Sequence, residues 1–533
     1  MPKDMTQEPP TTGSDRLDKR VFLIAGVVVL GSIMSILDIT VVSVAQQSFQ
    51  QEFDASAAET AWTMTGYTLA LAAVIPLTGW AADRFGTKRL YLIAIVLFAL
   101  GSALCALAQD LPQLVAFRVL QGLGGGMLMP LGMTILTRAA GPDRVGRVMA
   151  VLGIPMLLGP IFGPILGGWL IDIASWHWIF LINLPIGVVA LIYAWLALPK
   201  DEVHPSESFD FVGMILLSPG LALLLYGISM IPENGTFFTP ESWVPSLIGA
   251  VLVLAFVPWA LSSKNDHPLI ELRLFENKEL TVAVLTMGLF AMAFFGASLL
   301  FPQYFQLVRG EDALHAGLLL APQGLGAMLT MPIGGMLADK IGPGKVVLPG
   351  ITTIVIGMGM FATLDDTTPY WFLMLSLFVM GMGMGCTMMP TFSAALSTLR
   401  DHTIARGSTL MNIIQQVAAS VGTAIFTVLL TNGFKDSPSI GTVQGITEAL
   451  GNPDDVQAYA QQNPEQFAQV LQQFGVSPDE FMQLAGSVLP DMADVFASTF
   501  VVAAAMVACC LIPAFFLPRS KKEHGAAAPT VLH

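Results

Sequence analysis

Long apolar segments constrain the fold of this chain more than any other feature of its sequence. A helix needs about 20 apolar residues to cross the ~30 Å hydrocarbon core of a bilayer. Charged residues make up only 12% of the chain, about half their usual share in a soluble domain. We therefore expect an all-α integral membrane protein. The fourteen predicted spans are residues 21–45, 60–82, 90–109, 112–138, 146–173, 178–198, 210–230, 243–262, 281–305, 315–338, 344–364, 370–398, 406–430 and 492–517.

The basic residues support an even number of spans with both ends on one side. If the N-terminus is cytoplasmic, the 24 lysine and arginine residues fall in the tails and the cytoplasmic loops, except Arg118, Arg309 and Lys435. This is the asymmetry that the positive-inside rule describes. The opposite loops are acidic instead. We therefore expect a multi-pass protein of the plasma membrane with cytoplasmic N- and C-termini.

A short motif occurs after the second span and again after the tenth. Residues 79–89 read GWAADRFGTKR and residues 335–342 read GMLADKIG, so both follow the pattern G-x-x-A-D-[RK]-x-G. Two six-span halves with two spans inserted between them explain the eight-span separation, and paired halves are a common transporter plan. The expected parts are an N-tail (1–20), an N-terminal six-helix bundle (21–200), the inserted spans (201–264), a cytoplasmic linker (265–280), a C-terminal six-helix bundle (281–517) and a C-tail (518–533).

Residues 431–491, before the last span, differ from the spans in being polar, acidic and rich in glutamine. Helix starts are predicted at Asn452-Pro453, Asn463-Pro464 and Ser477-Pro478, because a capping residue there precedes a proline at the first helical position. We expect this extracytoplasmic insert to form a cap of short amphipathic helices. The alternative is a mobile loop.

Two charged residues fall inside predicted spans at matching depths. Asp38 lies near the far end of the first span and Arg118 near the start of the fourth. At ~1.5 Å rise per residue, both would lie about 10 Å below the same face. An unpaired charge in hydrocarbon is costly, so this acid and base are expected to pair and to have a function. We expect both to face a shared cavity, with a static structural pair as the alternative.

Three further groups of residues are candidates for packing or substrate contact. In the fifth span, Gly159, Gly163 and Gly167 form a small-xxx-small ridge for close helix approach, and Pro160 and Pro164 should bend the helix. Met380, Met384 and Met388 form either an adaptable cavity wall or a lipid-facing surface. Amide side chains avoid lipid, and those expected to line a substrate cavity are Gln121, Gln303, Gln306, Asn412, Gln415 and Gln416.

These segments together resemble the major facilitator superfamily, and specifically its fourteen-span drug:proton antiporter family. Residues 79–89 are similar to the family's loop signature, and residues 118–122 (RVLQG) to its span-four signature. Residues 159–168 (GPIFGPILGG) are similar to the span-five signature of exporters. The resemblance covers nearly the whole chain. It also includes residues 37–42, 176–187 and 268–275, with departures at Ser43, Gln46, His177 and Gln415.

The resemblance implies a proton-coupled antiporter that exports small amphipathic or lipophilic compounds, and it assigns proton coupling to Asp38 with Arg118. No acidic residue lies deep in the last six predicted spans, which favours neutral or monovalent substrates. The alternatives are export of an endogenous lipid or metabolite, symport, and a transporter-like sensor that moves nothing. The implied gating loop comprises Gly79, Asp83, Arg84, Gly86, Lys88 and Arg89, with Asp339 as a weaker counterpart, and the span-five motif comprises Gly159, Pro160, Gly163, Pro164, Gly167 and Gly168.

The expected partners are a small amphipathic substrate, protons and membrane lipid. The net charge of −14 argues against nucleic acid. The sequence contains no G-x-x-x-x-G-K-[ST] phosphate loop, so no ATP motor is expected. We therefore expect a monomer driven by the proton gradient without a cofactor or metal, and no enzymatic activity.

Overall fold

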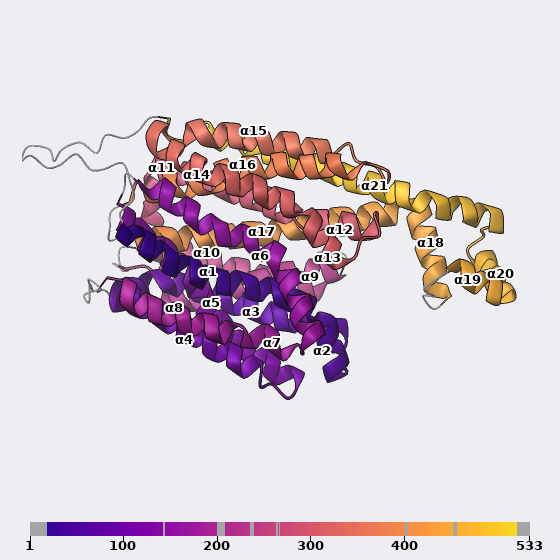
Figure 1. The fold of residues 1–533 in the computed structure, drawn as a ribbon, viewed down its shortest axis with the longest axis horizontal. Helices are drawn as coiled ribbons and strands as arrows, with labels where there is room; N and C mark the ends of the chain where they lie inside the picture. The colour runs from indigo at the N-terminus through magenta and orange to yellow at the C-terminus, as the bar shows by residue number, and fades with distance from the viewer. Residues whose placement is uncertain are drawn as a thin grey trace, which may run out of the picture.

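The computed structural model describes residues 19–141, 144–199, 208–234, 239–262, 265, 267–399, 403–450 and 456–519, and the statements below concern these residues. Long helices run side by side along one axis (Figure 1). Thirteen helical segments are long and apolar enough to cross a membrane. The 29-residue helix α6 (Val145–Ile173) occupies the remaining predicted span. The prediction of an all-α fold with fourteen spans is confirmed.

The N-terminal bundle is built around α5, whose glycine-rich segment lets two neighbours approach closely. A Cβ atom on Gly122 would lie 2.5 Å from the Tyr67 carbonyl oxygen of α3, and one on Gly124 would lie 2.5 Å from the Phe98 nitrogen of α4. The bundle comprises α1 (Lys19–Val44), α2 (Gln46–Phe53), α3 (Ala57–Phe85), α4 (Thr87–Cys105), α5 (Leu111–Ala140), α6, α7 (His177–Leu181) and α8 (Asn183–Ala197).

The inserted hairpin and the C-terminal bundle complete the membrane part. In the ninth span a π-helical turn, η3 (Ala291–Phe295), follows α11 (Lys278–Phe290) and precedes α12 (Leu300–Leu307). The hairpin is α9 (Phe211–Asn234) and α10 (Pro240–Leu261), followed by the short 3-10 helix η2 (Leu272–Glu276). The remaining helices are α13 (Ala313–Leu319), α14 (Ala321–Ile341), α15 (Gly344–Phe361), α16 (Tyr370–Leu396), α17 (Ile404–Asp436), α21 (Pro478–Cys509) and α22 (Leu511–Ala514).

The two bundles meet along two seams. In the first, α6 packs against α14 and α16; in the second, α3 and α5 pack against α17. Helix α9 contacts both α3 and α17, so the inserted hairpin lies along the second seam. The aromatic pairs Trp62–Tyr226 and Trp80–Phe209, with ring centroids 5.6 and 4.5 Å apart, attach the hairpin segment to α3. The insert therefore covers one seam and leaves the other to α6 and α14.

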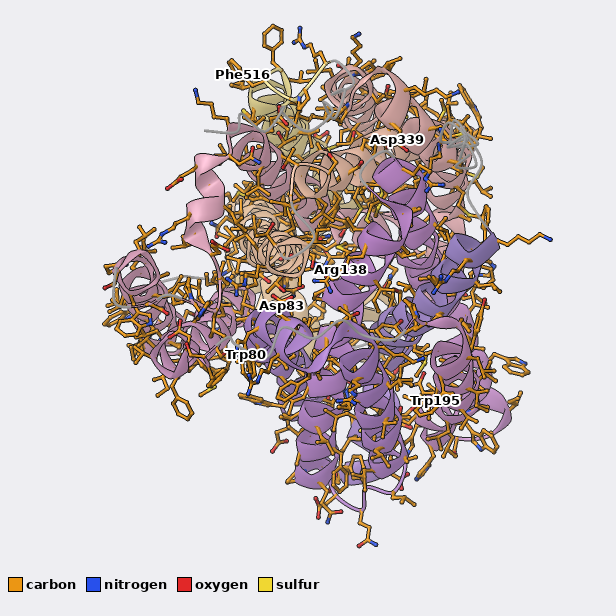
Figure 2. The ribbon with its side chains drawn as sticks, turned by 90° about the vertical axis from the view of Figure 1, so that its left-hand side faces the viewer. Trp80, Asp83, Arg138, Trp195, Asp339 and Phe516 are labelled. Carbon is orange, nitrogen blue, oxygen red and sulfur yellow. The ribbon has the colours of Figure 1, made fainter. Side chains whose placement is uncertain are left out.

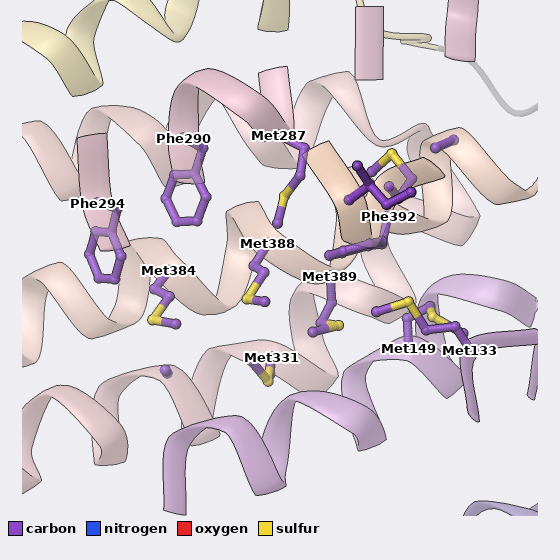
Figure 3. Close-up of a cluster of buried hydrophobic side chains, with 14 of the residues drawn as sticks. Met133, Met149, Met287, Phe290, Phe294, Met331, Met384, Met388, Met389 and Phe392 are labelled. Atoms are coloured by element: carbon purple, nitrogen blue, oxygen red, sulfur yellow. The ribbon is translucent and has the colours of Figure 1, made fainter. Parts of the chain in front are cut away.

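A methionine-rich cluster fills the space between the bundles (Figure 3). Met133 of α5 and Met149 of α6 lie near Met331 of α14 and Met388 of α16 (Figure 3), and each of the four is fully buried. Close packing holds α16 here, because a Cβ on Gly385 would lie 2.7 Å from the Ala327 carbonyl oxygen of α14. Met380, Met384 and Met388 are at most 5% exposed. The alternative that these three face lipid is therefore wrong.

Short helices project beyond the membrane bundle at the end opposite the start of α1 (Figure 1). They are α18 (Pro438–Ala449), α19 (Val456–Gln462) and α20 (Pro464–Gln473), together with the first turns of α21. Helices do begin at the predicted Pro464 and Pro478, and Ser477 forms a capping box with Glu480. Asn452-Pro453 lies outside the described residues. The last predicted span is thus the second part of a longer helix, whose first turns belong to the cap.

The cap has a small apolar core of its own, which makes it an ordered unit of short helices rather than a simple loop. The buried side chains of this core are Ile446, Leu450, Leu471 and Phe481.

Candidate functional site

Helices α1 and α5 bring Asp38 and Arg118 into contact, so the pairing predicted from their depths is confirmed. Arg118 Nη1 donates to Asp38 Oδ2 and also to Gln121 Oε1 at 2.7 Å. Arg118 Nε donates to the Thr63 carbonyl oxygen at 3.0 Å. The guanidinium lies 4.3 Å from the centre of the Tyr67 ring, where cation–π attraction adds to the ion pair.

The second oxygen of the Asp38 carboxylate is bound by two amides. Gln121 Nε2 donates to Asp38 Oδ1 at 2.8 Å and Asn183 Nδ2 donates to it at 3.2 Å. Both amides also donate to Ser102 Oγ at 2.9 Å. Asp38, Arg118, Gln121, Asn183 and Ser102, which we call the carboxylate cluster, come from four helices of the N-terminal bundle. This network satisfies both carboxylate oxygens, as a buried charge requires.

The prediction that Asp38 and Arg118 face a shared cavity is wrong for this conformation. The Asp38 side chain has no exposed surface and Arg118 is 1% exposed. The reason is that Gln121, which was expected to line the substrate cavity, turns instead toward the carboxylate inside its own bundle. Exchange of a proton at Asp38 therefore needs a second conformation that admits water to the cluster.

The glycine ridge of α6 packs against the turns of α1 around Asp38. A Cβ atom on Gly163 would collide with the Thr40 side chain, and one on Gly159 would collide with Ile36. Thr40 Oγ1 donates to the Gly159 carbonyl oxygen at 3.1 Å. The predicted close approach of the ridge is confirmed, with Gly167 against Val41. Gly168 faces open space, and the side chains of Pro160 and Pro164 lie outside the described residues.

Asp83 joins the two halves at the end of the bundle where the α3–α4 and α14–α15 loops lie. We call this end the basic end. The Asp83 carboxylate is 4% exposed and lies 3.3 Å from Arg138 of α5 and 3.7 Å from Arg406 of α17. A Cβ on Gly79 would lie 3.4 Å from Arg406 Cα, so α3 approaches α17 closely here. Seen from this end, Asp83 and Arg138 lie near the middle of the molecule (Figure 2).

The second copy of the motif makes the corresponding contact at the other seam. Asp339 Oδ1 accepts from the Gly146 backbone N–H at 2.9 Å, and Oδ2 accepts from Arg147 N–H at 3.2 Å. These groups start α6, where a carboxylate is favoured by the unpaired amides and the helix dipole. Gly335 packs on Gly146. Each motif thus docks on the start of the fifth span of the opposite half, Asp83 through side chains and Asp339 mainly through backbone N–H groups.

The remaining residues of the predicted gating loop have local roles. Gly86 ends α3 with φ 91°, a conformation that favours glycine. Lys88 Nζ donates to the carbonyl oxygens of Trp195 and Leu198 at 2.7 and 2.8 Å, and so caps the C-terminus of α8. Arg84 is half-buried and Arg89 is exposed. The Lys88 ammonium therefore binds its own bundle, and its place in the gating loop stays a prediction.

The amides predicted to line a substrate cavity do not gather in one place. Asn412 is buried at the second seam and donates to the Ser408 carbonyl oxygen and to Met133 Sδ. Gln416 lines a crevice of about 10 Å³ between α3, α9 and α17, which is roughly enough for one water molecule and far too small for a substrate. Gln303 and Gln415 are half-buried, and Gln306 is exposed.

Sequence reasoning missed several polar residues that complete these contacts. Asn183 could have been found as an amide inside an apolar run, but the hydroxyl of Ser102 carries no comparable signal. Arg138 and Arg406 were interpreted only as topology charges. Ser408, which bonds Thr134 Oγ1 across the second seam at 2.8 Å, had no distinguishing pattern.

Asp83→Asn is expected to loosen the basic end, because it removes the charge that binds Arg138 and Arg406 across the seam. The test is a cysteine placed at Thr134, which is buried at that seam. With Asp83→Asn, this cysteine should react about tenfold faster with a membrane-impermeant maleimide than in the parent, because loss of a buried ion pair destabilises the closed seam more than loss of an exposed pair would. The four native cysteines are first replaced. Asp54→Asn, an exposed carboxylate after α2, is the control, and equal rates in both variants would contradict the gate.

Comparisons with known proteins agree with this architecture. Residues 28–423 match the sequence profile of the Major Facilitator Superfamily. The chain is 47% identical over 517 residues to "Multidrug resistance protein B homolog" of Mycobacterium tuberculosis (strain ATCC 25618 / H37Rv), covering 96% of this chain and 93% of that one. It is 33% identical over 409 residues to "Multidrug export protein EmrB" of Haemophilus influenzae, covering 76% and 79%.

Solved structures are similar in fold. The human organic anion transporter MFSD10 gives a TM-score of 0.59 at 15% identity, covering 94% of this chain and all of that one. The proton:xylose symporter XylE gives 0.54 at 15% identity, covering 92% and 95%.

Proposed function

The chain belongs to the Major Facilitator Superfamily, and on that premise we propose that it is a proton-coupled antiporter that exports small amphipathic or lipophilic compounds by alternating access. It is a multi-pass membrane transporter related to multidrug export proteins. The observation that carries the proposal is the enclosed pair of Asp38 and Arg118. A carboxylate in the membrane is costly even when it is paired, so its presence there suggests a function. Asp38 is the residue of the pair that can exchange a proton, because a guanidinium stays protonated.

The contacts around Asp38 suggest how a proton could drive the conformational change. Protonation would remove the charge that holds Arg118, and so weaken the link between α1 and α5. Helix α1 is packed on α6 through the glycine ridge, and α6 packs on α14 of the other half. A shift of α1 would therefore be transmitted through α6 to the contact between α6 and α14 at the first seam. In this cycle a proton from outside releases the substrate, and loss of the proton inside permits reloading.

The gate contacts indicate which route is shut in this conformation. Asp83 and Asp339 join the halves at the basic end across both seams. Since basic loops face the cytoplasm in most membrane proteins, we place the basic end and both termini at the cytoplasmic side of the plasma membrane. On this placement, the contacts of Asp83 and Asp339 would close the cytoplasmic side in this conformation.

The driving force follows from one carboxylate carrying about one proton per cycle. Moving one charge through the membrane potential yields ~2.3 kcal/mol per 100 mV, and a pH gradient adds to this. No cofactor is needed. If the substrate is a monovalent cation, exchange for one proton is electroneutral.

The substrate class is proposed from the surfaces between the halves. Methionine side chains are prominent in the cluster that Figure 3 shows between the bundles, and they adapt to ligands of varied shape. The predicted spans of the C-terminal bundle hold one acidic residue, Asp494, near the start of the last span. Asp38, the acid deep in the N-terminal bundle, is already bound by Arg118. Neutral or monovalent amphipaths are therefore favoured over divalent cations.

Purified protein in proteoliposomes tests the proposal, with ethidium as the transported probe. An imposed pH gradient should drive ethidium against its concentration gradient, and ethidium movement should in turn move protons. Ethidium that binds but is not moved by a pH gradient would favour a sensor. Movement in the same direction as the protons would favour a symporter.

A further inference from the structure

The linker between the inserted hairpin and the C-terminal bundle brings an additional carboxylate to the basic end. Arg406, in the first turn of α17, lies between two acidic side chains. Its Nε is 3.7 Å from Asp83 Oδ2, and its Nη1 donates to Glu271 Oε2 at 3.3 Å. With Arg138 on the other side of Asp83, the side chains form a row of alternating charge. We call Arg138, Asp83, Arg406 and Glu271 the charge row.

Glu271 is held in place by a buried anchor on the inserted hairpin. Asp210, 6% exposed, accepts at Oδ2 from the Asn265 side chain at 2.9 Å and from Leu269 N–H at 3.2 Å. Its Oδ1 accepts from Trp259 Nε1 at 2.8 Å and from Gly213 N–H at 2.7 Å. One carboxylate therefore ties α9, α10 and the linker together. The anchor reaches Leu269, two residues before Glu271, and so positions the backbone from which the partly exposed Glu271 side chain approaches Arg406.

The two acidic partners of Arg406 belong to different parts of the molecule. Asp83 lies on α3 of the N-terminal bundle, so opening the second seam at the basic end would separate it from Arg406. Glu271 lies on the linker just before η2, which packs on α11 of the C-terminal bundle. The hairpin that anchors the linker packs on α17 as well as on α3, and the inference requires that Glu271 follow α17 when the seam opens. Arg406 is 7% exposed, and a guanidinium at such a site is costly without a counter-ion. A partner that moves with α17 would limit that cost.

We propose that Glu271 is a positioning residue of the gate, which keeps Arg406 paired when the basic end opens and thereby sets the balance between the closed and open states. In the closed state Arg406 is shared by two carboxylates, whereas in the open state Glu271 binds it alone. The pair of Glu271 and Arg406 therefore stabilises the open state more than the closed one. This inference rests on the proposed alternating access and adds a carboxylate outside the repeated motif.

Asp83→Asn and Glu271→Gln should therefore shift the balance between the open and closed states in opposite directions. Asp83→Asn removes a contact made only in the closed state, so it shifts the protein toward open. Glu271→Gln removes a contact that counts most in the open state, so it shifts the protein toward closed. A merely structural role for Glu271 would loosen the basic end when it is lost, and would give the same sign as Asp83→Asn.

Distance measurement across the basic end distinguishes these signs. The side chains of Leu196 and Phe516 are 76% and 67% exposed. Trp195, which precedes Leu196 in the sequence, and Phe516 lie at opposite edges of the basic end (Figure 2). Spin labels at Leu196→Cys and Phe516→Cys, in the full chain lacking its native cysteines and held in lipid nanodiscs, report the separation by double electron–electron resonance. At a pH where the parent chain populates both separations, Glu271→Gln should lower the ratio of open to closed about two- to fivefold.

Matched variants control for folding and for local charge. Glu276 is exposed in the same linker and has no ion pair within the described part of the chain, so Glu276→Gln should leave the distances unchanged. Glu271→Asp keeps the charge and should restore most of the parent distribution. The inference is overturned if Glu271→Gln raises the ratio of open to closed, or if it gives the same ratio as Glu276→Gln. If Asp83→Asn and pH also leave the separation unchanged, the failure lies with alternating access instead.

Discussion

Asp38→Asn is expected to reduce pH-driven ethidium export to the level of protein-free vesicles. The amide keeps the shape of the carboxylate and can still accept from Gln121 and Asn183, but it cannot take up and release a proton. The variant should insert in the membrane and still exchange ethidium across it without a gradient. Paired measurements of ethidium flux and internal pH in proteoliposomes check this expectation.

A control is needed because Asp38→Asn leaves the charge of Arg118 buried without its partner, which is destabilising. The double variant Asp38→Asn with Arg118→Gln removes both charges, and it should recover thermal stability without recovering coupled export. Asp110→Asn changes an exposed capping carboxylate at the start of α5 and should export normally. Coupled export at the normal rate in either Asp38 variant would refute the assignment of the proton to this residue.

Gly163→Val is expected to lower export at least about tenfold and to destabilise the protein by ~1–3 kcal/mol, as overpacking of a tight contact does. The added Cβ would collide with Thr40 on the turn of α1 that follows Asp38. Helix α1 would have to move off α6, and the carboxylate would shift relative to Arg118. Ethidium flux and the midpoint of thermal unfolding measure the two effects.

Gly168→Val provides a matched control on the same helix. Gly168 has no atom within contact distance of its missing Cβ, so the same substitution should leave export and stability close to normal. Normal export by Gly163→Val would show that the packing of α1 on α6 is not needed for transport, and would remove the proposed route from Asp38 to the first seam.

Much of the fold could be predicted from the length of the apolar segments, from a repeated motif and from the positions of a few charged and capping residues. Apolar length gives the spans, and the depths of Asp38 and Arg118 predict their contact. The repeated motif predicts two halves, and the capping pattern at Ser477-Pro478 predicts the start of α21. These features depend on local sequence and on the membrane itself, so they are visible without knowledge of the packing.

The site was less predictable because its details depend on contacts between distant segments. Nothing in the sequence indicates that Gln121 turns to Asp38 rather than to a cavity, since that depends on the positions of Ser102 and Asn183. Lys88 is a second example, because its binding to the carbonyl oxygens of Trp195 and Leu198 depends on where α8 ends. The role of Asp339 likewise depends on where α6 begins relative to α14. Pairing between helices, unlike span length, is not encoded by local pattern.

Counting the protons released when ethidium binds tests whether Asp38 couples export to proton movement. Asp38 is enclosed in this conformation, so coupling requires a second state that opens the carboxylate cluster to water and links substrate binding to proton release. In weakly buffered nanodiscs with a pH indicator, we expect release of about one proton per ethidium bound by the normal chain, and none by Asp38→Asn. Equal release by the two proteins, or ethidium binding by the normal chain without any release, would contradict the account.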